Sequence, residues 1–149
     1  MQTTFPRLML DHAQARPNAP ALREKSYGIW QTTTWAQLAL LVRQLACGMA
    51  EAGLRRGDHV VVVGDNRPRL YWSVAACQCL GGIPVMMYQD AVAQEMVYVL
   101  QDAEIKFAIV EDQEQVDKML EIAGEAPLLE HVIYDEPRGM RHYTQALLM

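Results

Sequence analysis

The sequence predicts an α/β fold in which a mostly parallel sheet is flanked by helices and preceded by an N-terminal helix and a β-hairpin. Near-continuous apolar runs such as 59–63 are typical of strands that are covered on both faces. Longer segments between these runs carry apolar residues at helical spacing. Because strands and helices alternate, the strands are expected to be parallel and joined by right-handed crossovers.

Composition indicates one globular unit. The 149 residues suffice for a single hydrophobic core, and 51% of them are hydrophobic and 21% charged. The net charge of -5 argues against a general nucleic-acid role, which needs a basic face. The apolar runs are too short to span a bilayer, and residues 1–6 lack the features of a secretory signal, so a cytoplasmic location is expected. No repeat or linker divides the chain, and 1–149 is expected to form a single α/β segment.

The first part of the chain predicts a helix and a hairpin. Residues 4–15 predict a short helix with Thr4 as its N-cap, and prolines follow its end. The runs 21–24 and 29–33 predict two strands, since the second is rich in β-branched and aromatic residues. The turn between them is expected at 26–28.

The clearest helix begins after Thr34. Thr34 and Gln37 fit a capping box, in which each side chain accepts from the other residue's backbone N–H. Gly53 suits the left-handed turn that ends a helix, and Leu54 is expected to fold back onto Met49. Helical spacing predicts that the buried face consists of Leu38, Leu41, Val42, Leu45 and Met49.

Three shorter strand–helix units and a final strand follow. The strands are predicted at 59–63, 83–87, 106–110 and 131–134. Asn66 is expected to cap the first helix, with Pro68 in its first turn, and Asp112 is expected to begin the third. The apolar faces of the second and third helices are predicted to be Met96, Val97, Val99, Leu100 and Ala103, and Val116, Met119, Leu120 and Ala123, with Gly124 ending the third. Residues 142–149 are expected to begin another helix.

Neither a metal site nor a disulfide is predicted. Cys47, Cys77 and Cys79 form no disulfide framework and are expected to be small, buried side chains. On a helix, Cys77 and Cys79 would point in nearly opposite directions, so they do not form a metal-binding pair. The four histidines are scattered, and none forms a pair at i and i+4.

Motifs for nucleotide or acyl chemistry are missing from the sequence. It has no G-x-G-x-x-G or G-x-x-x-x-G-K-[ST] loop, and none of its three lysines follows a glycine-rich loop. It has no G-x-S-x-G elbow, and no cysteine lies in a nucleophile motif. We therefore assign no catalytic residue, no metal ligand and no cofactor to this stretch.

Four charged clusters allow both a structural and a functional interpretation. Residues 55–58 fit a polar turn better than an anion site, and 111–114 fit a solvated helix start. Residues 65–67 and 88–90 follow the carboxyl ends of strands, where ligands of open α/β sheets bind. Capping and turn roles explain these last two clusters as well, so both interpretations stay open.

The order of elements carries more information than any single motif. The series runs through the helix and strand of 34–60, the helix–Gly–x–x–Pro passage of 75–85, and the helix and strand at 95–100 and 103–110. This series resembles the N-terminal region of AMP-forming acyl-CoA synthetases and related adenylating enzymes. The sequence of residues 83–89, Ile-Pro-Val-Met-Met-Tyr-Gln, is most similar to that of the long-chain fatty-acid branch of this family.

The resemblance implies that the chain is an N-terminal subdomain of a larger adenylating domain. The whole enzyme would convert a fatty acid, ATP and CoA into acyl-CoA, AMP and pyrophosphate, with Mg²⁺ accompanying ATP. The family's phosphate loop, adenine-binding motif, ribose-binding aspartate and adenylation lysine have no matching position here. The segment is therefore expected to be a scaffold without catalytic activity of its own, with the remainder of the ligase as its partner.

The resemblance also places three residues near the acyl pocket of such an enzyme. Asn66, Tyr88 and Gln89 are expected to line it, because they follow strand ends. Contact with a membrane is expected only through the fatty-acid substrate. A truncated scaffold would expose apolar surface that later segments cover, so it is expected to self-associate.

Two other interpretations remain beside the ligase fragment. One is a free-standing, non-catalytic α/β module that serves binding or interaction. The other, a nucleotide-binding enzyme complete in 149 residues, is disfavoured because no phosphate site is visible. The length of the open reading frame separates the first of these from the ligase fragment.

Overall fold

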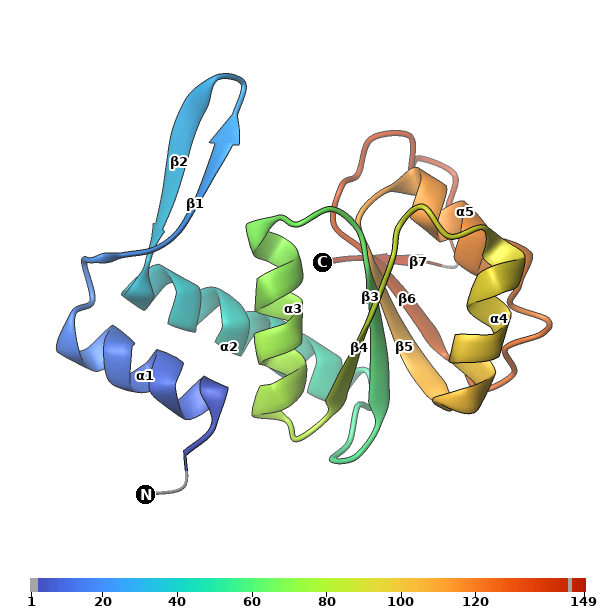
Figure 1. Cartoon of the computed structure of the whole chain (residues 1–149), viewed down its shortest axis with the longest axis horizontal. Helices are drawn as coiled ribbons and strands as arrows, with labels where there is room; N and C mark the ends of the chain where they lie inside the picture. Colours follow the sequence, from blue (N-terminus) through green and yellow to red (C-terminus); the bar gives the residue numbers. More distant parts are fainter. Residues whose placement is uncertain (1–2, 145) are drawn as a thin grey trace.

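The structure is a computed structural model that describes residues 3–144 and 146–149 (Figure 1). In chain order its elements are α1 (Phe5–Ala15), β1 (Pro20–Ser26), β2 (Ile29–Thr34), α2 (Trp35–Glu51), β3 (His59–Val63), α3 (Pro68–Cys79), β4 (Ile83–Met87), α4 (Ala93–Asp102), β5 (Ile105–Val110), α5 (Gln113–Glu121), β6 (His131–Tyr134) and β7 (Ala146–Leu148). The predicted α/β fold with its leading helix and hairpin is confirmed.

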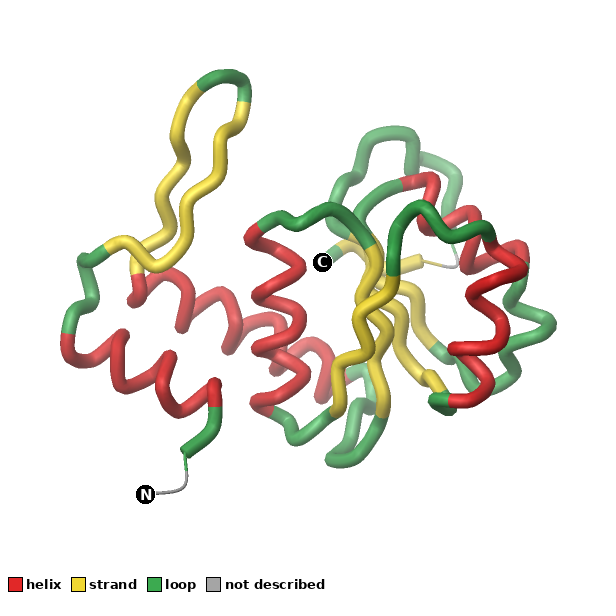
Figure 2. The backbone as a smooth tube through the Cα atoms, in the orientation of Figure 1, coloured by secondary structure: helices red, strands yellow, loops and turns green. Residues whose placement is uncertain are grey.

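The hairpin projects from the rest of the molecule (Figure 2). Strands β1 and β2 pair antiparallel, and their two-residue turn uses positive φ at Tyr27 (50°) and Gly28 (80°). Such a turn matches the twist of the strands on either side. Thr4 caps α1 by accepting from the backbone N–H of Arg7, as predicted.

The main sheet has five parallel strands in the order β4-β3-β5-β6-β7. Four of them lie where the sequence predicts strands. The helix predicted at 142–149 is wrong, because Ala146–Leu148 forms β7 beside β6. Without β7 the backbone groups of β6 would stand at an open edge, and a sheet edge readily takes a further strand. Strand β7 therefore depends on the edge of β6, which the spacing of apolar residues within 142–149 does not reveal.

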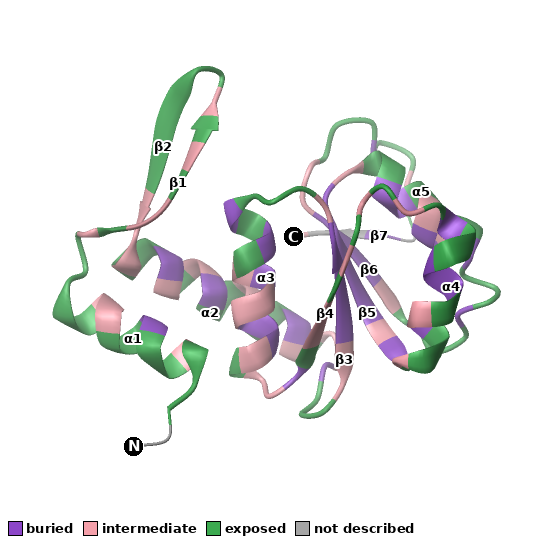
Figure 3. Ribbon diagram, viewed as in Figure 1, coloured by how far each residue is buried: buried purple, intermediate pink, exposed green. Residues whose placement is uncertain are grey.

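Strands β3, β5 and β6 are largely buried (Figure 3), and they send alternate side chains to two cores. In β3, Val61 and Val63 pack with α4 and α5, whereas Val60 and Val62 pack with α2 and α3. All four are fully buried, which fits the continuous apolar run. The layers are therefore α2 and α3 on one face of the sheet and α4 and α5 on the other.

Helix α2 begins and ends as predicted. The capping box is present, with the backbone N–H of Thr34 donating to Gln37 Oε1 over 2.9 Å and that of Gln37 donating to Thr34 Oγ1 over 3.3 Å. Gly53 has a φ of 106°, and the backbone N–H of Leu54 donates to the carbonyl of Met49 over 2.9 Å.

The buried stripe of α2 is narrower than predicted. Leu38, Val42 and Met49 are buried, but Leu41 and Leu45 are only half-buried, because they face an open hollow on the molecular surface. Spacing identifies the face of a helix, whereas the neighbours decide whether that face is covered.

Two predictions about helix ends need correction. Asn66 does not cap α3: Arg67 occupies the N-cap position, without a side-chain capping bond, and Pro68 opens the first turn. Helix α5 ends at Glu121, ahead of Gly124. Its predicted start is confirmed, since Asp112 accepts from the backbone N–H of Gln115 over 3.2 Å.

The cysteines differ in exposure, although all three are free. Cys77 is buried in the α2–α3 core, where burial raises the pKa of its thiol to about 12. Cys47 and Cys79 are exposed, so the expectation that all three are buried is wrong for these two. Among the described residues, none of the helices is both long and apolar enough to cross a membrane.

Candidate functional site

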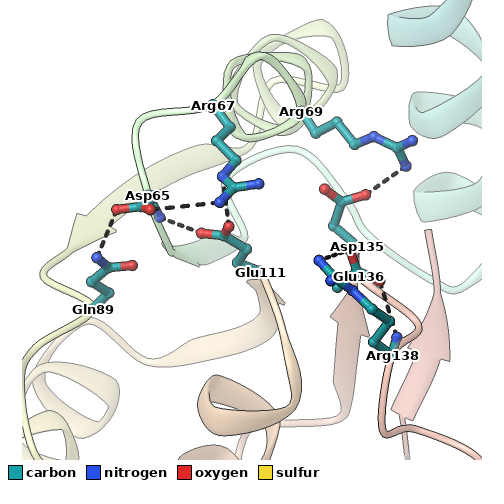
Figure 4. A network of polar contacts seen from close by, with 8 residues as sticks. All are labelled: Asp65, Arg67, Arg69, Gln89, Glu111, Asp135, Glu136 and Arg138. Carbon is teal, nitrogen blue, oxygen red and sulfur yellow. Dashed lines mark hydrogen bonds and ion pairs between the residues drawn. The ribbon is translucent and has the colours of Figure 1, made fainter. Parts of the chain in front are cut away.

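The carboxyl ends of the parallel strands gather the polar segments at one edge of the sheet (Figure 4). Gly64 and Asp65 follow β3, Gln89 follows β4, Glu111 follows β5 and Asp135 follows β6. The topology therefore brings together residues that are far apart in the sequence. We define the carboxyl-edge network as Asp65, Arg67, Arg69, Gln89, Glu111, Asp135, Glu136 and Arg138.

Glu111 lies at the centre of one half of this network. Its side chain accepts from the backbone N–H of Asp65 over 2.5 Å and from Arg67 Nε over 2.8 Å. Glu111 is only 8% exposed, so the expected solvated helix start at 111–114 is wrong at its first residue. Gly64 makes room for it: with φ at 155°, a Cβ at Gly64 would lie 2.7 Å from the Glu111 Cβ.

Gln89 connects the end of β4 to this half of the network. Its Nε2 donates to Asp65 Oδ1 over 2.7 Å. Its backbone carbonyl accepts from Lys118 Nζ over 2.6 Å and from Gln115 Nε2 over 3.2 Å. Helix α5 thus fixes the loop that carries Gln89, and Gln89 in turn holds Asp65.

The other half of the network follows β6. Arg69 Nη1 donates to Asp135 Oδ1 over 2.5 Å, and Arg138 Nη2 donates to Glu136 over 3.1 Å. Burial raises the pKa of Asp135, while the Arg69 guanidinium acts in the opposite direction. The hydrogen bond from Arg138 lowers the pKa of Glu136. The Arg69–Asp135 pair holds the loop after β6 against α3, and the Arg138–Glu136 pair joins two residues within that loop.

The three residues predicted to line a pocket occupy different settings. Asn66 accepts a hydrogen bond from the Tyr71 hydroxyl and borders a small hollow of about 190 Å³, together with Gly64, Asp65, Leu70, Tyr71 and Met86. Gln89 is bound to Asp65 beside this hollow. Tyr88 is 84% exposed. The topology therefore joins the two predicted clusters, 65–67 and 88–90, through a single hydrogen bond.

Sequence reasoning missed Glu111 and Asp135 as members of this edge. Both residues directly follow buried strands, and Asp65 follows one after a single glycine. This position at a strand end could have identified them in the sequence. Acidic residues at a helix start are usually solvated, which favoured the wrong interpretation of Glu111.

The remaining charged cluster, residues 55–58, lies at the other end of the strands, directly before β3 begins. Asp58 accepts from the backbone N–H of Arg55 over 2.8 Å and from Lys106 Nζ over 2.7 Å. The hydrogen bond from Lys106 lowers the pKa of Asp58. The Arg55 guanidinium donates to backbone carbonyls of α2 and of Leu54. These contacts confirm the polar turn predicted for 55–58.

The carboxyl-edge network does not fit a triphosphate. It contains three guanidinium groups, and each already pairs with a carboxylate; the four carboxylates outnumber them. An incoming phosphate would have to displace these pairs and would meet net negative charge. No group of three or more His, Cys, Asp or Glu side chains that could hold a metal occurs in the part of the chain described. The charged side chains of this network are therefore paired with one another.

Comparison with known proteins gives relatives that include two long-chain-fatty-acid–CoA ligases. The chain is 31% identical over 121 residues to the long-chain-fatty-acid–CoA ligase ACSBG1 of Rattus norvegicus, covering 80% of this chain and 17% of the ligase. It is 26% identical over 144 residues to the long-chain-fatty-acid–CoA ligase FadD15 of Mycobacterium tuberculosis, covering 93% of this chain and 24% of the ligase. The uncharacterized protein Rv1549 of the same organism is 36% identical over 117 residues, covering 78% of this chain and 63% of Rv1549.

The fold and the family model agree with these relatives. The acetoacetyl-CoA synthetase from Streptomyces lividans superposes with a TM-score of 0.86 at 25% identity, covering 96% of this chain and 24% of the synthetase. The described segment thus corresponds to part of a larger domain in that enzyme. The model of the family described as AMP-binding enzyme matches residues 9–146. The chain therefore belongs to the AMP-binding enzyme family.

Proposed function

We propose that this chain forms the N-terminal scaffold of an AMP-forming acyl-CoA synthetase that acts on fatty acids. The observation that carries the proposal is the family match over residues 9–146 together with relatives named as long-chain-fatty-acid–CoA ligases. The whole enzyme would convert a fatty acid, ATP and CoA into acyl-CoA, AMP and pyrophosphate in the cytoplasm. This chain spans only part of the length of those two ligases: it covers 17% of ACSBG1 and 24% of FadD15.

The pairing of the described charges supports the scaffold role. The guanidinium groups of Arg67, Arg69 and Arg138 are each committed to carboxylates at the carboxyl edge. ATP, Mg²⁺ and CoA would accordingly be held by the remainder of the ligase, which is the partner of this segment. Residues 1–149 would act as one α/β segment of that larger domain.

We place Asn66, Tyr88 and Gln89 on the wall of the acyl pocket. The hollow beside Asn66 and the exposed ring of Tyr88 support this placement, since both offer surface at the ligand-binding edge of the sheet. Membrane contact would then arise only through the fatty-acid substrate.

A chimeric ligase tests the proposed function. This chain would replace the matching segment of FadD15, and acyl-CoA formation from a 16-carbon fatty acid would be measured. We expect the FadD15 chimera to form acyl-CoA and the isolated chain to show no ATP–pyrophosphate exchange with any fatty acid. Exchange by the isolated chain would contradict the scaffold role, and a folded but inactive chimera would contradict the ligase assignment.

The pocket wall is tested in the same chimera. Tyr88→Ala should change the KM for the fatty acid or the preferred chain length, while the KM for ATP stays constant. Arg23→Ala, on the projecting hairpin, is the matched control. Equal effects of the two substitutions on the fatty-acid KM would remove Tyr88 from the pocket.

The second candidate is a non-catalytic binding or interaction module. One observation favours it: the chain covers 63% of Rv1549, so a relative exists that is far shorter than the ligases. A folded but inactive FadD15 chimera would support this module.

The isolated scaffold is also expected to self-associate. Large apolar side chains are exposed on the hairpin, among them Tyr27 at 93%, Ile29 at 66% and Trp30 at 58%. Light scattering over a concentration series should show growth in mass. A strictly monomeric chain at high concentration would contradict this expectation.

A further inference from the structure

The turn between β3 and α3, residues 64–67, is held by side chains that come from other strand ends. Residues 65–67 are exposed, and within the turn the backbone N–H of Arg67 donates to the carbonyl of Asp65 over 2.7 Å. Gln89, after β4, and Glu111, after β5, both bind Asp65. A short exposed turn has few contacts of its own, so its position depends on the groups that hold it.

Glu111 connects this turn to two further parts of the sheet. Its backbone N–H donates to the carbonyl of Val63 over 3.0 Å, which ties β5 to β3. Its carbonyl accepts from the backbone N–H groups of Asp135 and Glu136 over 3.2 and 2.7 Å, which ties β5 to the loop after β6. Its carboxylate is the group that holds residues 64–67. A change of the side chain should therefore release the turn and leave the backbone contacts in place.

The surroundings of the Glu111 carboxylate fix its position. The side chain is 10% exposed, and a Cβ at Gly64 would lie 2.9 Å from its Oε2. A buried carboxylate needs hydrogen bonds and a counter-charge, which the backbone N–H of Asp65 and the Arg67 guanidinium supply. Because both of these donors belong to the turn, the buried charge and the position of the turn depend on each other.

The same turn carries a wall of the hollow at the carboxyl edge. Asn66 borders this hollow of about 190 Å³ together with Tyr71 and Met86. The Tyr71 hydroxyl donates to Asn66 Oδ1, so a shift of the turn alters the contact between these two lining residues. A binding wall functions only when the residues behind it hold it to within about 0.5 Å.

We infer that Glu111 is a positioning residue for the acyl-pocket wall. Its carboxylate holds the 64–67 turn so that Asn66 faces the fatty-acid chain, while Glu111 itself stays buried beneath Gly64 and does not touch the substrate. Arg67 supplies the counter-charge. The inference rests on the proposed function, which places Asn66 on that wall.

Glu111→Gln in the FadD15 chimera tests the role, because it keeps the size of the side chain and removes its charge. The KM for a 16-carbon fatty acid should rise at least ~5-fold, while kcat and the KM for ATP stay within about 2-fold, as for a loss of binding alone. Arg67→Gln should act in the same direction. The double variant should be no worse than E111Q, because two side chains that act as one unit are not additive.

Asp58→Asn is the matched control at the other end of the strands. The Asp58 side chain is 12% exposed and, like that of Glu111, accepts from one backbone N–H and one cation. Asp58→Asn should therefore lower the melting temperature of the chimera, as E111Q does, but leave the KM for the fatty acid unchanged. An equal rise of this KM in D58N would reduce the effect of Glu111 to general stability and overturn the inference.

Amide hydrogen exchange in the isolated chain follows the turn without any ligase activity. In E111Q the amide of Asp65 should exchange at least ~10-fold faster, whereas the amides of Asp135 and Glu136 should keep their rates, because they bind the backbone of Glu111. An unchanged rate at Asp65 would overturn the inference. If E111Q does not fold, R67Q gives the same two readouts, since the Arg67 side chain is 54% exposed.

Failure of the positioning role and failure of the proposed function give different results. An active chimera in which E111Q leaves the KM for the fatty acid unchanged would refute the positioning role and leave the ligase function standing. A folded chimera that is inactive before any substitution would contradict the ligase function and, with it, the acyl pocket. Exchange at Asp65 in the isolated chain would then still decide whether Glu111 holds the turn.

Discussion

Both faces of the parallel sheet carry buried apolar clusters, but the two faces are not equally closed. On the α4–α5 face, Met96 and Met119 are fully buried, and the segment after β6 adds Met140 to the same core. On the α2–α3 face, Leu41 and Leu45 border an open hollow. The difference shows that an apolar stripe predicts which side of a helix favours burial. The number of elements packed on that side decides how far it is buried.

The largest expected effect separates the closed face from the open one. Met96→Ala should lower the free energy of unfolding by about 2–5 kcal/mol, because it leaves a cavity in a sealed core. Leu45→Ala should cost less than about 1 kcal/mol, because the side chain is already partly in water. Urea unfolding of the isolated chain measures both, and equal costs would refute the distinction between the faces.

A somewhat smaller effect is expected at the boundary between the faces. Gly64 lies between Leu70 of the α2–α3 core and Glu111 of the carboxyl edge, where a Cβ would come within 2.9 Å of each. Gly64→Ala should cost about 2–3 kcal/mol through crowding and backbone strain. Gly57→Ala is the control: its φ of 89° is also unfavourable, but a Cβ there would meet no atom of the described residues within 4 Å, so about 1 kcal/mol is expected. If both substitutions cost the same, crowding against Glu111 is not the cause.

A stabilising substitution would sharpen the picture of the open face. Gly48 lies inside α2 with open space around it, so Gly48→Ala should raise the free energy of unfolding of the isolated chain by about 1 kcal/mol through helix propensity. If a later part of the ligase covers this face in the FadD15 chimera, the gain should shrink or change sign there, because that segment would meet the added methyl group. Thermal unfolding of both proteins provides the measurement. A gain of the same size in the chimera would show that this position stays uncovered.

The smallest expected effect depends on pH. Burial raises the pKa of Asp135 above 3.8, so the folded state binds its proton more tightly than the unfolded state does. This contribution to stability is present at low pH and is lost as the pH rises through the raised pKa. The stability of the native chain minus that of Asp135→Asn should therefore fall as the pH rises from 3.8, by less than about 1 kcal/mol because Arg69 is half exposed and compensates. Urea unfolding of both proteins between acid and neutral pH is the measurement, and a difference that rises with pH would contradict the sign.

Much of the fold was predictable because its signals are local. The capping box of Thr34 and Gln37, the left-handed Gly53 and the valine run of β3 each act within a few residues. Strand β7 was not predictable, because it forms against the edge of β6 rather than through a pattern of its own. The cap of α3 was missed for a related reason: Asn66 bonds to Tyr71 instead of to the backbone of the helix start.

The candidate site was predictable only as a location. The rule that ligands bind at the carboxyl ends of strands points to the end of the sheet that carries Asp65 and Gln89, and a binding role there stays a prediction. The rule could not show that Glu111 is buried beneath Gly64 or that the arginines are committed to carboxylates. These facts depend on which strand ends become neighbours, and the strand order sets them.

The sequence by itself determined the elements of this protein, the two-sided burial of its strands and its resemblance to the adenylating enzymes, because periodicity, caps and glycine positions are written into adjacent residues. Only the tertiary structure decided which face of the sheet carries an open hollow, which carboxylates pair with which arginines, and that the buried Trp72 N–H has no acceptor among the described residues. The physical reason is that burial and pairing are properties of neighbours in space. In this chain those neighbours come from strands and helices far apart in the sequence.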